Sequence, residues 1–397
     1  MAEGHNTPCK TVKEGKTEHV DSKKSNISVN LIEKGIEENE GVILHTSVGP
    51  ITETWFADCC KFWPGESHLF KVDKILLEGK SEYQDVLVFE NSAYGKIVIL
   101  NGAIQLTQKD ECAYQEMMTH LPLCSIPNPE KLLLIGGGDG GILREASRHA
   151  SLEQIDICEL DKMIIDIYEK YFPDIAIGYK DPRVRLHLGD GIAFLNSVVP
   201  GTYDAIILDA FHVMEELADK DFLQSVARAL RPGGILCAPA ESFWGENLEL
   251  HNVITLCRKV FKGSVEYAWT TNTSLTFFSV IFSGVIGFML CSTEGPPVDF
   301  RHPINPLDEN ENSGIANTPS KFYNSDVLIL FPAIHFNVSF SPLRLTNYNC
   351  LSLCYECTDA HCSFHFAHVH EDVYQFAERE QLRRKTINRR HLCTQSC

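Results

Sequence analysis

The first part of the chain is polar and is followed by short segments in which apolar residues recur. Residues 1–50 are mixed in charge and without clear periodicity, so we predict a mostly disordered leader there. Strands are predicted over Phe70–Leu76, Asp85–Phe89 and Lys96–Leu100, because these segments are rich in β-branched and aromatic residues and are bounded by turn sequences such as NSAYG and NG. The pattern predicts a small antiparallel β domain over roughly residues 51–106.

An alternating series of helices and strands follows. Apolar residues at helical spacing, with acidic residues in the first turn, predict a helix over Asp110–Leu121. Five segments then predict strands, the first of them buried: KLLLIG, QIDICELD, RVRLHLGDG, YDAIILDA and GGILCAP. The segments GILREASRHA and KMIIDIYEKYF, which come after the first two of these strands, predict helices. Because strands that alternate with helices form parallel sheets, the sequence predicts an α/β fold with a doubly wound parallel sheet.

One uncharged stretch, Thr270–Thr293, has the apolar character of a membrane span. Its apolar part, Leu275–Cys291, is 17 residues long, whereas a spanning helix needs about 20 apolar residues. The stretch also contains several serine and glycine residues. We therefore predict two buried strands around a turn at Ser283-Gly284, and no membrane partner.

Charge and the opening residues narrow the class of protein. The chain has 35 Lys and Arg against 53 Asp and Glu, a formal net charge of −18, and residues 51–326 contribute 22 − 39 = −17 of it. An acidic chain lacks the basic surface that nucleic-acid binding needs, so no nucleic-acid partner is predicted. The opening sequence MAEGHNTPCK lacks the apolar segment of a secretory signal, so we expect a cytoplasmic protein whose central cysteines are reduced thiols.

A glycine-rich turn, GGGDGG, follows the first predicted strand of the α/β section and opens a helix. Glycines allow a tight turn and let the backbone approach a ligand, although this motif alone predicts only a turn. Four acids stand at the carboxyl ends of successive strands or directly after them: Asp139, Glu159, Asp190 and Asp209. Each alone could cap a helix. Because the carboxyl ends of parallel strands meet at one edge of a sheet, the four together predict a ligand site.

The same acids narrow the ligand class. Glu159 follows Asp139 by 20 residues, an offset at which an acid typically accepts hydrogen bonds from ribose hydroxyls. The charge of Asp139 opposes a phosphate and favours a cation. A nucleoside that carries a sulfonium, and an ammonium in addition, fits these residues.

Three segments in order resemble the spermidine synthase family of aminopropyltransferases. They are YQDVLVFENSAYGKIVILNGAIQLTQKDECAYQEM, LLLIGGGDGGILREASRHASLEQIDICELDKM and LHLGDG, and the resemblance runs from about Trp55 to Asp326. It implies a Rossmann-like, methyltransferase-type parallel sheet preceded by a small antiparallel β domain. It also implies transfer of the aminopropyl group of decarboxylated S-adenosylmethionine to putrescine, which gives spermidine and methylthioadenosine. The donor is then a co-substrate, and no cofactor or metal is expected.

The resemblance assigns roles residue by residue. Asp139 matches the acid that binds the aminopropyl ammonium of the donor, and Glu159 matches the ribose ligand. The other donor-binding positions are Gln84, Gln115, Asp190 and Gly191, beside the glycine loop of Gly136, Gly137, Gly138 and Gly140. Tyr114 and Trp55 are expected to bind the acceptor. Asp139 also favours aminopropyl over methyl transfer, because an acid there would repel the carboxylate that ordinary S-adenosylmethionine retains.

The acceptor side departs from the family pattern. Asp209-Ala210-Phe211-His212 stands where the family has Asp-Ser-Ser-Asp, so Asp209 matches the first acid and His212 occupies the place of the catalytic acid. A histidine there is either a general base for the attacking amine or an ordinary loop residue. The resemblance is also lost abruptly at residues 271–282 and 327–397, and a displaced exon boundary is one hypothesis for both. A full-length transcript that encodes both segments would exclude that hypothesis.

The pattern and the resemblance together divide the chain into four parts. These are a leader over 1–50, an N-terminal β domain with its linking helix over 51–125, a Rossmann-like catalytic domain over 126–326 and an atypical Cys/His-rich extension over 327–397. The extension contains Cys354 and Cys357 in a C-x-x-C pair with several histidines nearby. Zinc ligands occur in such clusters, but the spacing is shorter than in common zinc modules, so we favour an extension without a metal site.

Three functions remain as alternatives. The first is a spermidine-forming aminopropyltransferase that acts on a small cationic amine, putrescine. The second is a catalytically weak or inactive paralogue that binds the nucleoside and dimerises with active subunits. The third is a spermine synthase or a putrescine N-methyltransferase. The resemblance implies a homodimer, or a heterodimer with related synthases.

Overall fold

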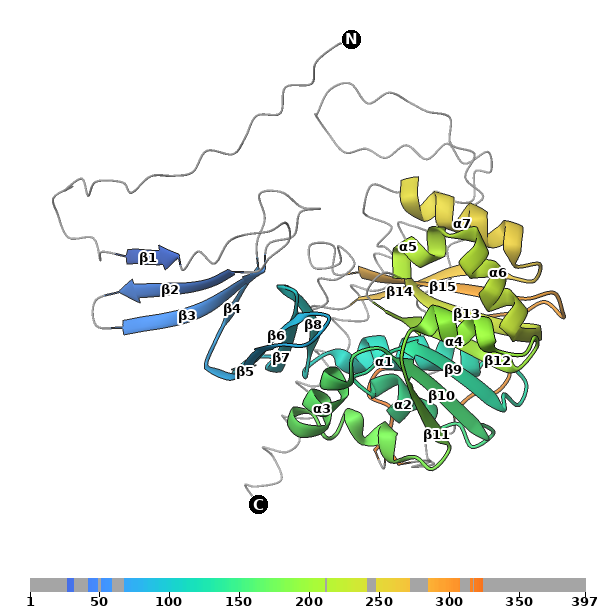
Figure 1. Ribbon diagram of the computed structural model, residues 1–397, viewed down its shortest axis with the longest axis horizontal. Coiled ribbons are helices and arrows are strands. Elements are labelled where there is room, and N and C mark those ends of the chain that lie inside the picture. The colour runs from blue at the N-terminus through green and yellow to red at the C-terminus, as the bar shows by residue number, and fades with distance from the viewer. Residues whose placement is uncertain are drawn as a thin grey trace, which may run out of the picture. The chain divides into compact units, whose positions relative to one another are not determined.

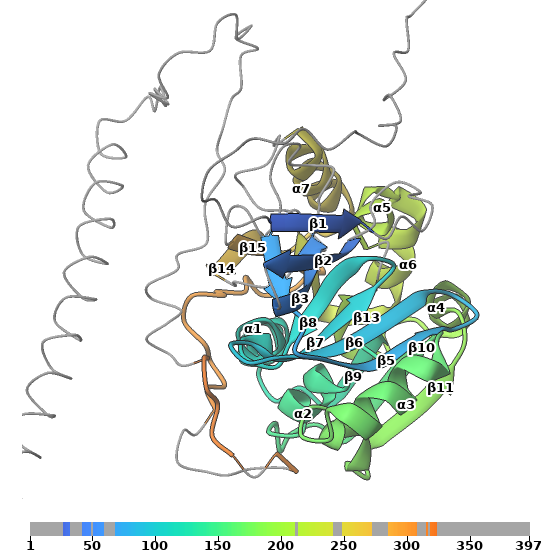
Figure 2. The same cartoon turned by 90° about the vertical axis from the view of Figure 1, so that its left-hand side faces the viewer.

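The computed structural model describes residues 27–31, 42–48, 51–58, 68–210, 213–240, 248–271, 285–307, 315–316 and 318–323 (Figures 1 and 2). His212, the turn at Ser283-Gly284 and the Cys/His-rich segment over 327–397 lie outside these residues. Within them, two small antiparallel sheets come first along the chain, and a seven-stranded sheet with its helices follows.

The first small sheet has the order β1-β2-β3-β4, with neighbouring strands antiparallel. Its strands are β1 (Ile27–Leu31), β2 (Val42–Val48), β3 (Ile51–Asp58) and β4 (His68–Lys71). Because β1 and β2 lie within residues 1–50, the prediction of a mostly disordered leader needs correction there. Their sequences ISVNL and VILHTSV place apolar residues at alternate positions over a few residues only, a pattern that suits two short strands, of which β1 pairs with β2 and β2 pairs with β3.

The second small sheet has the order β5-β6-β7-β8. Its strands are β5 (Lys74–Lys80), β6 (Asp85–Asn91), β7 (Gly95–Leu100) and β8 (Ala103–Thr107). The single strand predicted over Phe70–Leu76 is wrong, since the chain passes there from one sheet to the other. The N–H of Val72 donates to Thr54 of the first sheet, whereas the N–H of Asp73 donates to Glu90 of the second. Buried aromatic and aliphatic side chains of the two sheets form one cluster.

The large sheet has the order β11-β10-β9-β12-β13-β15-β14. Its strands are β9 (Lys131–Gly136), β10 (Gln154–Glu159), β11 (Val184–Leu188), β12 (Tyr203–Asp209), β13 (Leu230–Ala240), β14 (Val265–Thr271) and β15 (Val285–Ser292). Strands β9 to β13 are parallel, and β15 runs antiparallel between β13 and β14. This topology confirms the α/β fold with a Rossmann-like, methyltransferase-type parallel sheet preceded by small antiparallel sheets.

Among the described residues, the uncharged stretch Thr270–Thr293 supplies β15 and the last two residues of β14. β15 lies inside the stretch, as predicted, and pairs with two neighbours. Its antiparallel partner β14 begins at Val265, before the stretch. In the parts of the chain that the structure describes, no helix has the length and apolar character needed to cross a membrane.

Helices lie on both faces of the large sheet (Figures 1 and 2). They are α1 (Glu111–Leu123), α2 (Gly141–Ala146), α3 (Lys162–Tyr171), a 3₁₀ helix (Ala176–Lys180), α4 (Gly191–Ser197), α5 (Val213–Ala218), α6 (Lys220–Ala229) and α7 (Leu248–Val260). Helices α1 to α3 cover one face, and α4 to α7 cover the other. The helix predicted for GILREASRHA ends early, at Ala146, because tighter turns follow: the N–H of Arg148 donates to the carbonyl of Glu145.

Aspartates begin three of these helices. Asp161 accepts the N–H of Met163, Asp190 accepts that of Ile192, and Asp219 caps α6. A side-chain acceptor at this position satisfies one of the unpaired N–H groups of the first helical turn. Two of the caps, Asp161 and Asp190, follow strands β10 and β11, so the same residues that start helices also stand at the edge where a ligand site is predicted.

Helix α1 is tied to a segment far along the chain. The carboxylate of Glu116, which is 1% exposed, accepts the backbone N–H groups of Lys321, Phe322 and Tyr323 at 2.8, 2.8 and 2.6 Å. Three donors around one buried carboxylate offset the cost of removing its charge from water. Segment 318–323 therefore holds α1 in place on the sheet.

We expect Glu116→Gln to lower the free energy of unfolding by about 1–3 kcal/mol, because an amide offers a single acceptor oxygen and turns a donor group toward backbone donors. Urea denaturation followed by circular dichroism measures the change. Glu169→Gln, at an exposed position of α3, is the matched control and should change the same quantity by less than about 0.5 kcal/mol. Equal unfolding midpoints for the two variants would contradict the role given to Glu116.

Candidate active site

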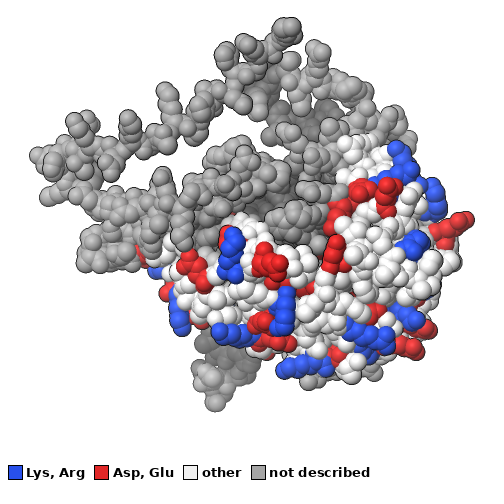
Figure 3. Space-filling model, in the orientation of Figure 1, with Lys and Arg blue, Asp and Glu red and all other residues white. Residues whose placement is uncertain are grey.

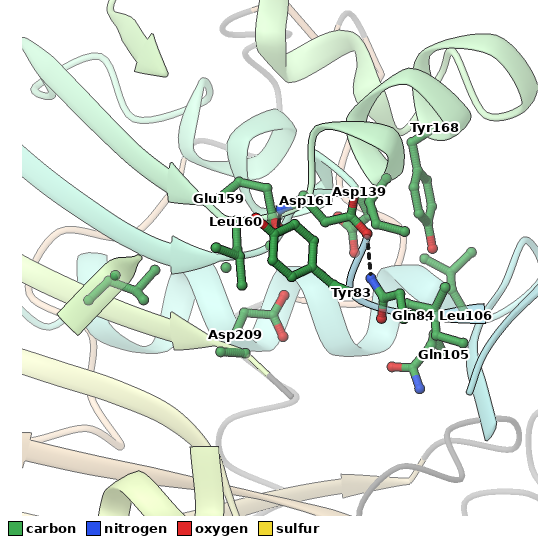
Figure 4. Close-up of a pocket in the computed structure, with 18 of the residues that line it drawn as sticks. Tyr83, Gln84, Gln105, Leu106, Asp139, Glu159, Leu160, Asp161, Tyr168 and Asp209 are labelled. Carbon is green, nitrogen blue, oxygen red and sulfur yellow. Dashed lines mark hydrogen bonds between the residues drawn. The ribbon is translucent and has the colours of Figure 1, made fainter. Parts of the chain in front are cut away.

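A cavity of about 460 Å³ opens at the carboxyl ends of the parallel strands, where α1, α3 and residues of the second small sheet meet (Figure 4). Eight acidic residues line it: Asp110, Glu111, Asp139, Glu159, Asp161, Asp190, Asp209 and Glu216. Within the described residues, the lining holds no Lys, Arg or His. Figure 3 shows acidic and basic residues interspersed on the outer surface of the described residues in that view. The cavity wall is therefore far more one-sided in charge than that surface, and it favours a cation.

The glycine turn after β9 brings strand ends together. Gly136 has φ +79°, and a Cβ atom there would overlap the carbonyl oxygen of Asp209. The N–H of Gly137 donates to that same oxygen at 2.9 Å. A Cβ atom on Gly138 would lie 2.8 Å from Oε2 of Glu159. Only glycine permits this approach, and the turn therefore fixes Asp139 between the ends of β10 and β12.

Two side chains of α1 contact two of the acids. Gln115 donates from Nε2 to Oδ2 of Asp139 at 2.8 Å, and the N–H of Gly141 donates to Oδ1 at 2.6 Å. The hydroxyl of Tyr114 donates to Oδ1 of Asp209 at 2.6 Å. Oε1 of Gln115 is buried and accepts no hydrogen bond from any described residue. The site thus holds one unused acceptor beside the carboxylate of Asp139.

Burial changes the acid strength of this pair. Burial, together with the charge of Asp209, raises the pKa of Asp139 to about 7, although the N–H of Gly141 and the amide of Gln115 pull it down. Burial also raises the pKa of Asp209, and the Tyr114 hydroxyl opposes that shift. Two carboxylates that share a low-dielectric site resist being ionised together. A cation between them relieves the repulsion.

Glu159, which was predicted to bind the ribose hydroxyls of a nucleoside, lies at the end of β10 as expected. Glu159 accepts the N–H of Asp161 at 2.7 Å through Oε1, and burial raises its pKa. Gln84, in the turn between β5 and β6, donates from Nε2 to Oδ2 of Asp161 at 3.0 Å, as the dashed line in Figure 4 shows. Asp161 was not predicted as a site residue. Its signal was available: it follows Glu159 by two residues and directly precedes a helix, as a capping residue does.

At the start of α4, Asp190 and Gly191 line the same cavity. Two apolar side chains of the lining, Leu160 and Ile192, are 47% and 44% exposed. An apolar rim beside acidic groups suits the flat base of a nucleoside, which buries its faces and bonds through its edges.

An ion pair fixes α1 relative to the glycine turn. The guanidinium of Arg144 on α2 binds the carboxylate of Glu111 with two hydrogen bonds, at 2.8 and 3.1 Å, and it also binds Glu145 at 2.6 Å. All three side chains are buried. Paired guanidinium and carboxylate groups hold a defined geometry. They therefore place Tyr114 and Gln115 opposite the turn.

Three predicted site residues need separate mention. Gly140 takes the left-handed conformation that begins α2, at φ +82°, and it is not part of the cavity lining. Trp55 lies on β3 and is not among the described lining residues either. Its neighbour Phe56 is 1% exposed in the cluster between the small sheets, and side chains alternate along a strand, so Trp55 faces away from that cluster. The roles of Trp55 and His212 stay predictions.

Comparison with known proteins defines the class. Residues 111–302 match the family model described as spermine/spermidine synthase domain, and residues 54–108 match that of the spermidine synthase tetramerisation domain. Spermidine synthase of Coffea arabica is 56% identical over 293 residues, which cover 73% of this chain and 91% of the relative. Spermidine synthase 1 of Datura stramonium is 58% identical over 283 residues, 70% of this chain and 90% of the relative.

Two solved structures of spermidine synthases are also similar to this chain. A crystal structure of spermidine synthase in complex with the transition state analogue AdoDATO is similar with a TM-score of 0.58 at 29% identity, and covers 67% of this chain and 86% of its own. Spermidine synthase of Thermotoga maritima is similar with a TM-score of 0.58 at 28% identity and the same coverage. The chain belongs to the spermine/spermidine synthase family.

Proposed function

We propose that this chain is an aminopropyltransferase that moves the aminopropyl group of decarboxylated S-adenosylmethionine to putrescine, with spermidine and methylthioadenosine as products. The observation that carries the proposal is the cavity itself, whose described lining has eight carboxylates and no basic side chain. Both substrates are cations, and such a lining attracts and holds them. Membership in a family of transferases of this kind supports the same reaction.

The donor occupies the part of the cavity around the glycine turn. Asp139 and Gln115 bind the ammonium of the aminopropyl group, and Glu159 accepts hydrogen bonds from the ribose hydroxyls. The base lies against Leu160 and Ile192, with Asp190 and Gly191 at its edge. Gln84 completes the wall, because its bond to Asp161 fixes the second small sheet against the start of α3.

The acceptor amine approaches from the side of Asp209 and Tyr114. A neutral amine nitrogen attacks the carbon next to the sulfonium: the new C–N bond forms, the C–S bond breaks, and sulfur keeps the electron pair as a thioether. One proton leaves the nitrogen, and Asp209, whose pKa is raised by burial, is positioned to take it. The chain contributes mainly by holding two cations in line against their repulsion. The sulfonium is a good leaving group already, so we propose that the reaction needs no cofactor and no metal.

Assembly and location complete the proposal. Residues 54–108 match a tetramerisation domain, so we propose that the chain assembles with a second synthase chain, either identical or related. Light scattering on the purified protein should give a mass above that of one chain. We also propose a cytoplasmic location, which the six free cysteines among the described residues support, because thiols stay reduced there.

A product assay tests the function. Purified protein is incubated with decarboxylated S-adenosylmethionine and with putrescine, spermidine or no amine, and methylthioadenosine is measured. We expect release with putrescine only. Release with spermidine alone would favour a spermine synthase, and donor binding without any release would favour an inactive paralogue. Equal activity with ordinary S-adenosylmethionine and a methylated product would favour the methyltransferase.

The pH dependence of donor binding follows from Asp139. Its pKa is raised to about 7, so the free site is largely protonated below that pH and binds the cationic donor only after losing the proton. We expect donor affinity to rise about tenfold between pH 6 and pH 8 and to level off above. Isothermal titration at several pH values measures this, and the same series with methylthioadenosine, which has no ammonium, should be nearly flat. Affinity that falls with rising pH would contradict the assignment of Asp139.

A further inference from the structure

One tyrosine hydroxyl in the cavity wall has no assigned role. Tyr168, on α3, is 2% exposed and lines the cavity, and its ring packs on Phe172 with the ring centroids 5.0 Å apart. Figure 4 shows the ring reaching from the helix toward Leu106, on the same side of the cavity as Gln84. Among the described residues, the Tyr168 hydroxyl makes no hydrogen bond, and its oxygen is not one of the fully buried unpaired atoms, so it is open to the cavity. A ligand group in the cavity can therefore become its hydrogen-bond partner.

The surroundings of Tyr168 indicate which ligand group this is. Its ring lies among apolar side chains of the second small sheet and α3, including Val86, Val88 and Leu106. Burial raises the pKa of Tyr168 well above its usual value, and the charge of Asp139 is the next contribution, followed by that of Asp209. The phenol is therefore neutral at physiological pH and lies within the electrostatic reach of the proposed ammonium-binding acid.

The ammonium of the donor needs more acceptors than that acid alone. A protonated primary amine carries three N–H donors. Asp139 supplies one acceptor, and the buried Oε1 of Gln115, which is unpaired within the described residues, supplies a second. A neutral phenol oxygen on the adjoining wall can supply the third.

We propose that Tyr168 is a specificity-determining residue of the donor site, whose hydroxyl oxygen accepts a hydrogen bond from the terminal ammonium of the donor beside Asp139 and Gln115. The proposal rests on the proposed function, since it requires decarboxylated S-adenosylmethionine as the donor. A residue that contacts the aminopropyl group contributes to the affinity for the donor and leaves the affinity for methylthioadenosine unchanged, because methylthioadenosine lacks that group. A residue that contacts the nucleoside contributes to the affinity for both ligands.

Tyr168→Phe is the test, because it removes the hydroxyl and keeps the ring. Dissociation constants of decarboxylated S-adenosylmethionine and of methylthioadenosine are measured by titration calorimetry for the wild type and the variant. We expect the donor to bind about tenfold more weakly to the variant, with methylthioadenosine unchanged within about twofold. In turnover, KM for the donor should rise, while KM for putrescine stays the same.

Tyr171→Phe is the matched control, since Tyr171 is on the same helix and its hydroxyl donates to the carbonyl of Leu76, at 3.1 Å, outside the cavity lining. This variant should bind both ligands as the wild type does. An unchanged donor affinity in Tyr168→Phe, or an equal loss for donor and methylthioadenosine, would overturn the proposal. A wild type that binds methylthioadenosine but not the donor would instead overturn the proposed function, so the two failures are distinguishable.

Discussion

Asp139→Asn should weaken binding of decarboxylated S-adenosylmethionine by about 100-fold or more, because it removes the buried charge that faces the ammonium of the donor. The substitution keeps the shape of the side chain and an oxygen that can accept the N–H of Gly141. Affinity for methylthioadenosine should change by less than about threefold. Titration calorimetry with the two ligands measures both effects, and parallel losses would mean that Asp139 supports the glycine turn and does not recognise the ammonium.

The same substitution should stabilise the folded protein at high pH. The folded-state pKa of Asp139, about 7, lies above the value of about 3.9 in an unfolded chain. Between these values the folded state binds more protons than the unfolded state, so this group lowers stability as pH rises, and its cost is complete above pH 7. We expect Asp139→Asn to be more stable than the wild type by on the order of 1 kcal/mol at pH 8. Near pH 4 the difference should vanish in thermal unfolding, and the opposite order would refute the raised pKa.

Asp209→Asn should lower kcat by about 10²- to 10⁴-fold, the range expected when a group that accepts a proton in the transition state is lost. Donor affinity should stay within about threefold, since Asp209 faces the acceptor side. Steady-state kinetics with a saturating donor measures the loss. Tyr114→Phe removes the hydroxyl that donates to Asp209 at 2.6 Å, and we expect a smaller loss of about tenfold.

The results for Asp209→Asn and Tyr114→Phe also test whether the segment Asp209–His212, which departs from the family pattern, supplies another proton acceptor. If Asp209→Asn retained most of the turnover, the proton would leave through another group, and His212, which the sequence resemblance predicts at the place of the family's catalytic acid, would be the residue to replace next. We expect the large loss of turnover in Asp209→Asn, because Asp209 is fixed by Tyr114 and by the glycine turn in the part of the site that the structure describes.

Much of the site could be predicted because it depends on local signals. Glu159, Asp190 and Asp209 end parallel strands or follow them directly, and short segments rich in apolar residues indicate these strands. Their convergence at one edge then follows from the geometry of a parallel sheet. Gly136 and Gly138 were predictable as well, since a turn that brings strand ends into contact leaves no room for a side chain.

The rest depends on how separate elements pack, which local pattern does not encode. Tyr168 occupies an apolar position of an amphipathic helix, so its sequence position predicts a residue of the hydrophobic core. It reaches the cavity only because α3 packs on the second small sheet. Gln84 is held by Asp161, 77 residues away in sequence. The break between β4 and β5 also has no local marker, because Val72 and Asp73 bond to two different sheets.

The most direct test of the account follows the new bond. Putrescine labelled with ¹⁵N is incubated with decarboxylated S-adenosylmethionine and the purified protein, and the polyamines are identified by mass spectrometry. The account predicts ¹⁵N-labelled spermidine in amounts equal to the methylthioadenosine released, with both lost in Asp139→Asn. Labelled putrescine recovered unchanged, from a protein that binds the donor, would contradict it.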